Sequence, residues 1–325
     1  RDASRNAGGI HEEMVDLLTN IYAYFSQGAT LPASWISGFF GSGKSSFAKL
    51  LGLALDGMKI PKLDSSGNEI GTWSMKEALI SRDDTANAGD LEAAFARLLS
   101  VMDPMTVLFD IGTMAQNNEI IPYTAYREIL KKLGYSSMDG VAHYELALEE
   151  NGSYEEFLKR YKSLHNAEWS AKKDSGMAAL QFRSVYKGMF PEQGDLLDIT
   201  TFKNSSLSVH SMVDSILAAM DRRAPGKTLF IVVDEVSQYI TGQDDSSKVN
   251  LQSFISEIGS RTKPGLARIW FIATGQEKLE EENKTSALFK LQDRFPPHLR
   301  VHLDRSNVHE VVERRLLKKK TGSEK

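Results

Sequence analysis

The stretch SWISGFFGSGKSSFAKLLGLAL, residues 34–55, decides the fold that we expect for this chain. Its apolar beginning, WISGF, predicts a short buried strand. Residues 38–45 then match the pattern G-x-x-x-x-G-K-[ST] at every fixed position, and apolar residues at helical spacing follow. Because a glycine-rich turn between a strand and a helix can wrap around phosphate groups, we predict a phosphate-binding loop here.

Each residue type in this loop has an expected task. Glycines let backbone N–H groups approach an anion closely, and the following helix presents its positive end to that anion. Lys44 would reach the β- and γ-phosphates of ATP, and the Ser45 hydroxyl would hold Mg²⁺. The alternative is a glycine-rich loop that matches by chance, but the flanking strand and helix signals argue against it. The predicted nucleotide-binding residues are Gly38, Gly41, Ser42, Gly43, Lys44, Ser45 and Ser46.

A second apolar run ends on two carboxylates. The segment LFIVVDE, residues 229–235, has the composition of a buried strand and ends with Asp234 and Glu235. Phosphate hydrolysis needs a carboxylate near the metal and a group that orients water. We therefore expect Asp234 on the Mg²⁺ side and Glu235 as general base. The alternative is that both carboxylates are ordinary residues at the start of a loop. The predicted phosphate-binding loop upstream argues against this alternative.

A third apolar run, IWFIATGQ at residues 269–276, carries two polar candidates near its end. The carboxyl ends of parallel strands meet at one edge of a sheet, so Thr274 or Gln276 would lie beside the phosphates. Either side chain would then contact the γ-phosphate or the attacking water. An ordinary strand end is the alternative interpretation.

An arginine precedes the last apolar run. In DRFPPHLRVHL, residues 293–303, Arg294 is the candidate arginine finger toward the γ-phosphate of a neighbouring subunit, with Arg300 and Arg305 as rivals. A surface salt bridge is the alternative role for all three. The predicted catalytic residues are Glu235, Lys44, Arg294, Thr274 and Gln276, and the predicted metal ligands are Ser45 and Asp234.

Strand-like runs alternate with helical patterns along the chain. Neither LFIVV nor IWFIA shows period-two alternation, which fits strands buried on both faces. We therefore expect an α/β fold in which helices cover a parallel sheet. The segment 59–72 is predicted to be a loop, because it is polar and rich in turn residues.

The domain organisation follows from a change in composition. Residues 122–199 are rich in aromatic, leucine and charged residues with few turn signals, which predicts a helical insertion into the α/β domain. The core is then formed by residues 12–121 and 200–305. Residues 306–320 would begin a helical lid. The chain begins with Arg1 and ends on a basic, polar tail, so we expect a piece of a longer protein.

Composition narrows the class of protein. The chain has 325 residues, a net charge of −4 and a sequence pI of about 6.0, which does not favour a cationic surface for nucleic acid. The absence of cysteine excludes disulfides and cysteine-ligated metals, and fits a cytoplasmic location. No apolar run is long enough to span a bilayer, so no membrane partner is expected. The basic cluster at 314–320 either touches DNA phosphates or is a solvated helix end.

These motifs, taken in order, resemble the AAA+ class of P-loop ATPases. A closer resemblance is to the BrxC/PglY family, the large P-loop ATPases of bacterial BREX phage-exclusion systems. It is carried by WISGFFGSGKS, VVDEVSQYI, IATGQEKL and DRFPPHLRVHL followed by VVERRLLKK. The segment ENGSYEEFLKRYKSLHNAEW is similar to that family's insertion. One departure is Ser46, where many members have histidine.

The resemblance implies an AAA+-like core with ATP and Mg²⁺ as cofactors. It also implies a homo-oligomer with nucleotide at subunit interfaces, other BREX proteins as partners, and DNA reached through that complex. Two functions stay open. The first is an ATPase that couples hydrolysis to remodelling of an oligomer or DNA complex, and the second is a scaffold gated by ATP with little hydrolysis. A small-molecule kinase is less favoured, because we recognise no motif for a second substrate-binding site in the sequence.

Overall fold

The computed structural model describes most of the chain in two compact units. The described residues are 10–28, 30–64, 66–81, 88–115, 119–193, 199, 201–241, 245–262, 267–276 and 289–303. The first unit spans Arg1–Met114 and Lys227–Lys325, and the second spans Ala115–Gly226. The second unit extends beyond the predicted insertion at both ends. The predicted lid helix and Arg305 lie outside the described residues.

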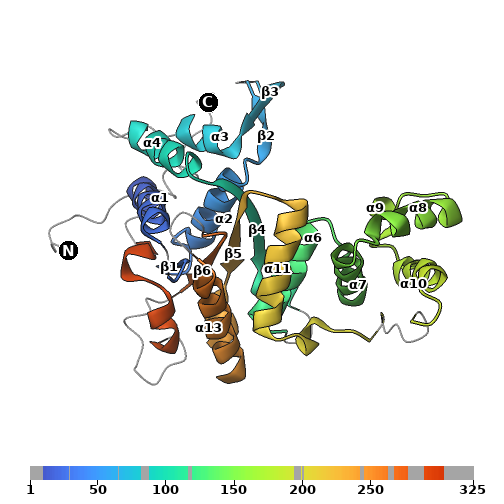
Figure 1. Ribbon diagram of the computed structural model, residues 1–325. Helices are drawn as coiled ribbons and strands as arrows, with labels where there is room; N and C mark the ends of the chain where they lie inside the picture. The colour runs from blue at the N-terminus through green and yellow to red at the C-terminus, as the bar shows by residue number, and fades with distance from the viewer. Residues whose placement is uncertain are drawn as a thin grey trace. The chain divides into compact units, whose positions relative to one another are not determined.

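The first unit is built on a five-stranded sheet in the order β4-β5-β6-β1-β7 (Figure 1). Every neighbouring pair of strands is parallel, so all five carboxyl ends lie at one edge. The strands are β1 (Ala33–Gly38), β4 (Asp103–Asp110), β5 (Lys227–Asp234), β6 (Ile269–Gly275) and β7 (Arg300–Leu303). The prediction of an α/β fold with a parallel sheet is confirmed.

Helices cover both faces of this sheet, as the unbroken apolar runs predicted. On one face, strand residues such as Phe230, Trp270 and Ile272 join a hydrophobic core with three helices. Those helices are α1 (Ile10–Gln27), α2 (Lys44–Leu55) and α4 (Ala88–Leu99). On the other face, Phe254 of α13 (Asp245–Ser260) meets Phe271 edge to face with ring centroids 6.3 Å apart. Each fully buried side chain of this size contributes about 1.5–3 kcal/mol to the free energy of folding.

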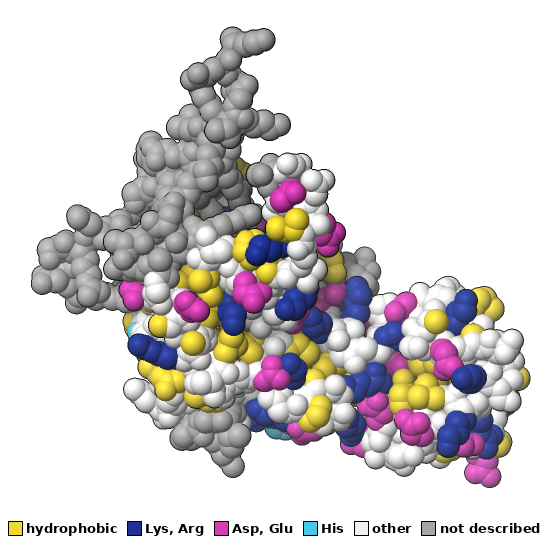
Figure 2. All heavy atoms as spheres, turned by 90° about the horizontal axis from the view of Figure 1, so that it is seen from above, with side chains coloured by type: hydrophobic (Ala, Val, Ile, Leu, Met, Phe, Trp, Pro, Cys, Tyr) yellow, Lys and Arg dark blue, Asp and Glu magenta, His cyan; other side chains and the backbone are white. Residues whose placement is uncertain are grey.

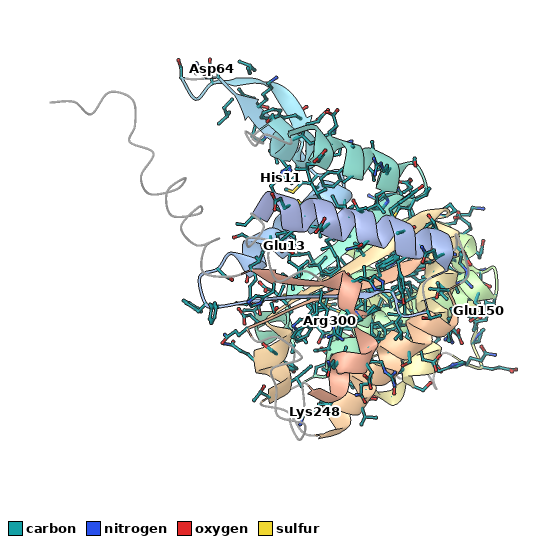
Figure 3. The ribbon with its side chains drawn as sticks, turned by 90° about the vertical axis from the view of Figure 1, so that its left-hand side faces the viewer. His11, Glu13, Asp64, Glu150, Lys248 and Arg300 are labelled. Atoms are coloured by element: carbon teal, nitrogen blue, oxygen red, sulfur yellow. The ribbon has the colours of Figure 1, made fainter. Side chains whose placement is uncertain are left out.

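Short elements complete the first unit. They are α3 (Met75–Ser81), α5 (Ile111–Met114), α12 (Val236–Thr241), and the 3-10 helices η2 (Phe289–Arg294) and η3 (Pro297–Leu299). The segment predicted as a loop at 59–72 instead forms an antiparallel hairpin, β2 (Lys59–Leu63) and β3 (Glu69–Ser74). The Asp64 carboxylate holds the turn, because it accepts hydrogen bonds from the backbone of Ser66 at 2.8 Å and Asn68 at 2.9 Å. Asp64 lies at the tip of the hairpin in Figure 3.

The second unit is helical in its described parts. Its elements are α6 (Ile121–Lys132), α7 (Asp139–Glu150), α8 (Tyr154–His165), α9 (Trp169–Lys172), α10 (Ala178–Met189), η1 (Asn204–Ser206) and α11 (Val209–Arg223). Aromatic side chains fill its core, and Phe157 and Tyr161 approach the Trp169 ring at centroid distances of 5.5 and 4.9 Å. The aromatic residues that predicted packed helices in this segment therefore form a core.

Buried polar contacts fix the helices of the second unit. Glu145 is fully buried and accepts hydrogen bonds from Ser136 N and Trp169 Nε1, each at 2.7 Å. The Arg223 guanidinium lies 3.5 Å from the centre of the Tyr135 ring and donates to Glu149 Oε1 at 2.7 Å. Buried or half-buried charges of this kind are stable only when paired, so these contacts specify how the helices pack.

The distribution of charged side chains and the lengths of the apolar helices bear on contact with DNA and with membranes. Over the described surface seen in Figure 2, acidic and basic side chains are interspersed with apolar ones. Among the described residues, no helix is both long and apolar enough to cross a membrane.

Candidate functional site

The loop after β1 has the backbone that its glycines predict. Gly43 has φ +91° and precedes the first residue of α2, a left-handed conformation that side-chain-bearing residues rarely adopt. Gly38 is required for a different reason. A Cβ at this position would lie 2.3 Å from Ser42 Oγ and 2.8 Å from Leu303 O. The loop therefore passes too close to β7 to accept any side chain at its first position.

The first turn of α2 places two of the predicted site residues, Lys44 and Ser45, against the end of β5. Ser45 Oγ donates a hydrogen bond to Asp234 Oδ1 at 3.0 Å. Lys44 is nearly buried, and its Nζ lies 3.8 Å from Glu235 Oε1. Ser46, in the same turn, is half-buried. The structure thus brings the loop together with the two carboxylates; Ser45 and Asp234 are 189 residues apart in the sequence.

Asp234 is the centre of the hydrogen-bond network at this edge. Its side chain is only 5% exposed. Oδ1 accepts from Ser45 Oγ at 3.0 Å, from Thr274 Oγ1 at 2.5 Å and from Glu235 N at 3.2 Å. Oδ2 lies 3.4 Å from Lys49 Nζ. These contacts hold the carboxylate in a single orientation at the carboxyl end of β5.

Glu235 has an unusual backbone. Its φ is +61°, one of two positive values found at non-glycine residues in the described chain. Such a conformation costs about 1–2 kcal/mol for an L-residue, so the surroundings must impose it. Two hydrogen bonds from its own N–H do so, to Thr274 Oγ1 at 3.0 Å and to Asp234 Oδ1 at 3.2 Å. Its side chain is 26% exposed, and Oε2 is buried without a hydrogen-bond partner.

Thr274 connects the two carboxylate residues. The side chain is fully buried, and its hydroxyl donates to Asp234 Oδ1 while accepting from Glu235 N. A hydroxyl has one hydrogen, so in this arrangement none is left for a phosphate. Gln276, the other candidate on this strand end, is half-buried, and its backbone N–H donates to Ser237 Oγ at 3.0 Å. Thr274 is thus a positioning residue in this geometry.

Two of the three candidate arginines, Arg294 and Arg300, lie among the described residues, and their surroundings differ. Arg294 ends η2, is half-buried, and has a buried Nε without a hydrogen-bond partner. Arg300, which is labelled in Figure 3, donates from Nε to Phe295 O and from Nη2 to Gln292 O, both at 2.8 Å. Arg300 therefore stabilises its own chain at these two carbonyls. Arg294 does not belong to the network around Asp234.

Two residues at this edge were not predicted from the sequence. Lys49 lies four residues after Ser45, so both are on the same face of α2, and this spacing was the available signal. Asp110 ends β4 and lies in register with Asp234 at the end of β5. Its position could have been predicted from the sequence, because it also follows an apolar run that ends on aspartate. Its Oδ1 accepts from Thr113 N at 3.2 Å, so it caps the short helix α5.

The residues present fit a nucleotide with Mg²⁺. Ser42 Oγ is buried in the loop without a hydrogen-bond partner, as expected of a group that a ligand satisfies. Ser45 and Asp234 supply one hydroxyl and one carboxylate, so Mg²⁺ here would take further oxygens from phosphate and water. Within the described ranges, no group of three or more His, Cys, Asp or Glu could hold a metal by itself.

Comparison with known families adds no assignment. No protein-family model matches the chain. The resemblance described above therefore depends on the quoted motifs. The class that the fold defines is an α/β protein with a parallel five-stranded sheet and a polar site at its carboxyl edge.

Proposed function

We propose that this chain is an ATP-binding and ATP-hydrolysing module of the P-loop NTPase class with an AAA+-like core. One observation carries the proposal: Ser45, Asp234, Thr274 and Glu235 converge through hydrogen bonds of 2.5–3.2 Å at the carboxyl edge of the sheet. Open α/β sheets bind ligands at that edge. The glycine-rich loop that enters α2 lies at the same edge, since Gly38 ends β1.

Each residue then has a task in hydrolysis. The loop N–H groups and Lys44 bind the phosphates, and Lys44 must exchange its contact with Glu235 for a phosphate oxygen. Ser45 and Asp234 would hold Mg²⁺, and the ion would supply positive charge that offsets the negative charge of the β- and γ-phosphates. Glu235 accepts the proton of the attacking water, and Thr274 holds the Glu235 backbone in place.

Replacing Glu235 by glutamine tests this assignment. The amide keeps the size of the side chain but is a poor base, so we expect ATP binding to persist and kcat to fall about 100-fold or more. Binding is measured with a fluorescent ATP analogue and turnover by phosphate release. Glu69→Gln on the exposed hairpin is the control and should behave as the unmodified protein. Turnover by Glu235→Gln at the unmodified rate would overturn the role of Glu235.

We further propose that the module works as a homo-oligomer in a BREX-type phage-defence complex that acts on DNA. The support is the motif resemblance and the exposed aromatic side chains of the loop, Phe39 at 48% and Phe40 at 89%. If Arg294 acts on a neighbouring subunit, mixing Lys44→Ala with Arg294→Ala should restore activity that neither variant has alone. An Arg294→Ala protein that is fully active as a monomer contradicts the shared site.

One observation favours the alternative of an ATP-gated scaffold with little hydrolysis. Lys44 Nζ lies 3.8 Å from Glu235 Oε1, and hydrolysis stays slow if this pair persists after ATP binds. This alternative predicts ATP-dependent assembly without phosphate release, even when DNA and partner proteins are present. Measuring molecular size and phosphate release in the same sample separates the two functions.

A further inference from the structure

We infer that Lys49 is a placeholder cation: its ammonium neutralises Asp234 while the site is empty, and Mg²⁺ must displace it when nucleotide binds. This inference rests on the proposed function, because it assigns a regulation to the same site. The carrying observation is the 3.4 Å separation between Lys49 Nζ and Asp234 Oδ2.

The two oxygens of Asp234 have separate partners. Three donors converge on Oδ1, from Ser45, Thr274 and the Glu235 backbone. Oδ2 faces the Lys49 ammonium instead. A metal-bound water beside Ser45 would need an oxygen that is not already saturated by donors, and Oδ2 is the oxygen that fits. Lys49 therefore occupies the side of the carboxylate that a hydrated Mg²⁺ would use.

Burial explains why a cation is needed there in the empty site. The Asp234 side chain is 5% exposed, and a carboxylate with so little solvent is stable only when it is paired and hydrogen-bonded. Removing the cation from such a pair leaves an uncompensated charge. Lys49 supplies the positive charge until the metal arrives, so Asp234 keeps its orientation throughout.

Exposure explains how the cation can leave. The Lys49 side chain is 46% exposed, whereas that of Lys44 is 5% exposed. Lysine carries its charge on a flexible stem, so Lys49 can swing into solvent without disturbing the core. Two cations beside one carboxylate repel each other, so a hydrated Mg²⁺ and Lys49 compete for the Oδ2 side of Asp234. The predicted consequence is a higher Mg²⁺ requirement than the bare site would have.

The test is a Mg²⁺ titration at a fixed concentration of a methylanthraniloyl-ATP probe, with fluorescence reporting bound nucleotide. Lys49→Gln should lower the Mg²⁺ concentration for half-maximal tightening by about two- to fivefold, the range that a half-exposed ion pair is worth. Lys49→Arg keeps the cation and should match the unmodified protein. Lys227→Gln is the matched control, because it removes a similarly exposed lysine from Asp103 at the opposite edge of the sheet.

The outcomes separate this inference from the proposed function. A Lys49→Gln protein with an unchanged or higher Mg²⁺ midpoint overturns the inference and leaves the nucleotide site standing. A large loss of probe binding in EDTA for Lys49→Gln also overturns it, since that result makes Lys49 a phosphate ligand. Failure of the unmodified protein to bind the probe at any Mg²⁺ concentration overturns the proposed function itself. Circular dichroism confirms that each variant is folded.

Discussion

The substitution Thr274→Val removes one hydroxyl from the centre of the site and nearly keeps the shape of the side chain. The lost hydroxyl donates to Asp234 Oδ1 at 2.5 Å and accepts from Glu235 N at 3.0 Å. A hydrogen bond to a charged group contributes about 1.5–3 kcal/mol to stability. The Glu235 N–H keeps its second acceptor, Asp234 Oδ1 at 3.2 Å, so it is not left unpaired. We expect a loss of about 2 kcal/mol in the free energy of unfolding.

Thr106→Val is the matched control for this loss. Thr106 is also a buried strand threonine, but its Oγ1 has no hydrogen-bond partner. Removing an unsatisfied buried hydroxyl should leave stability unchanged or raise it by up to about 1 kcal/mol. Urea unfolding measures both variants, with the midpoint and slope reported together.

We expect Thr274→Val to lower turnover as well as stability, and Thr106→Val to change neither by much. Without the hydroxyl, the strained Glu235 backbone loses one of the two bonds that hold it, and the base shifts from its place. Misplacement by about 1 Å can cost about 100-fold in rate, so kcat should fall roughly 10- to 100-fold while ATP binding persists. Thr274→Ser retains the hydroxyl and should recover most of both losses. The reasoning fails if Thr274→Val equals Thr106→Val in stability and in turnover.

Three further predictions concern other parts of the chain. Gly38→Ala places a Cβ 2.3 Å from Ser42 Oγ and 2.8 Å from Leu303 O, so it should cost about 1–3 kcal/mol in urea unfolding and abolish probe binding. Gly89→Ala, with no atom within 4 Å of the new Cβ, is its control, and equal behaviour of the two contradicts the close approach. Arg223→Met removes the cation stacked on Tyr135 and paired with Glu149, so it should destabilise the second unit by about 3 kcal/mol. The neighbouring, exposed Arg222→Met should change little, and thermal unfolding compares them. Burial lowers the pKa of His143, which stacks on Phe202 at 4.2 Å, so the folded state binds fewer protons than the unfolded state. Stability is therefore fully present above the unfolded pKa near 6.5 and falls as the pH drops toward the lowered folded pKa. Urea unfolding between pH 8 and pH 5 should show this loss of stability in the unmodified protein at pH values below about 6.5, and a smaller loss in His143→Phe; identical slopes contradict it.

Local patterns predicted the elements that carry the site. The unbroken apolar runs of β5 and β6 predicted strands covered on both faces, because no polar residue marks a solvent face. The spacing of Gly38, Gly43 and Lys44 predicted the loop, because only glycine tolerates the backbone that this turn requires. The hairpin at 59–74 was missed because its turn is held by the Asp64 side chain, and polar turn residues also describe an ordinary loop.

Contacts between distant segments required the tertiary structure. Three contacts could not be predicted from the sequence. The Thr274 hydroxyl donates to Asp234 Oδ1, and Lys49 Nζ lies near Asp234 Oδ2. Arg300 donates to two backbone carbonyls of its own chain. These facts depend on strand order, which brings β6 between β1 and β5, and on side-chain direction.

The sequence by itself determined the residue types at the carboxyl edge of the sheet, since strand ends and glycine turns are local features. The tertiary structure alone decided which of those residues touch, since hydrogen bonds act over about 3 Å and their partners lie far apart in the chain.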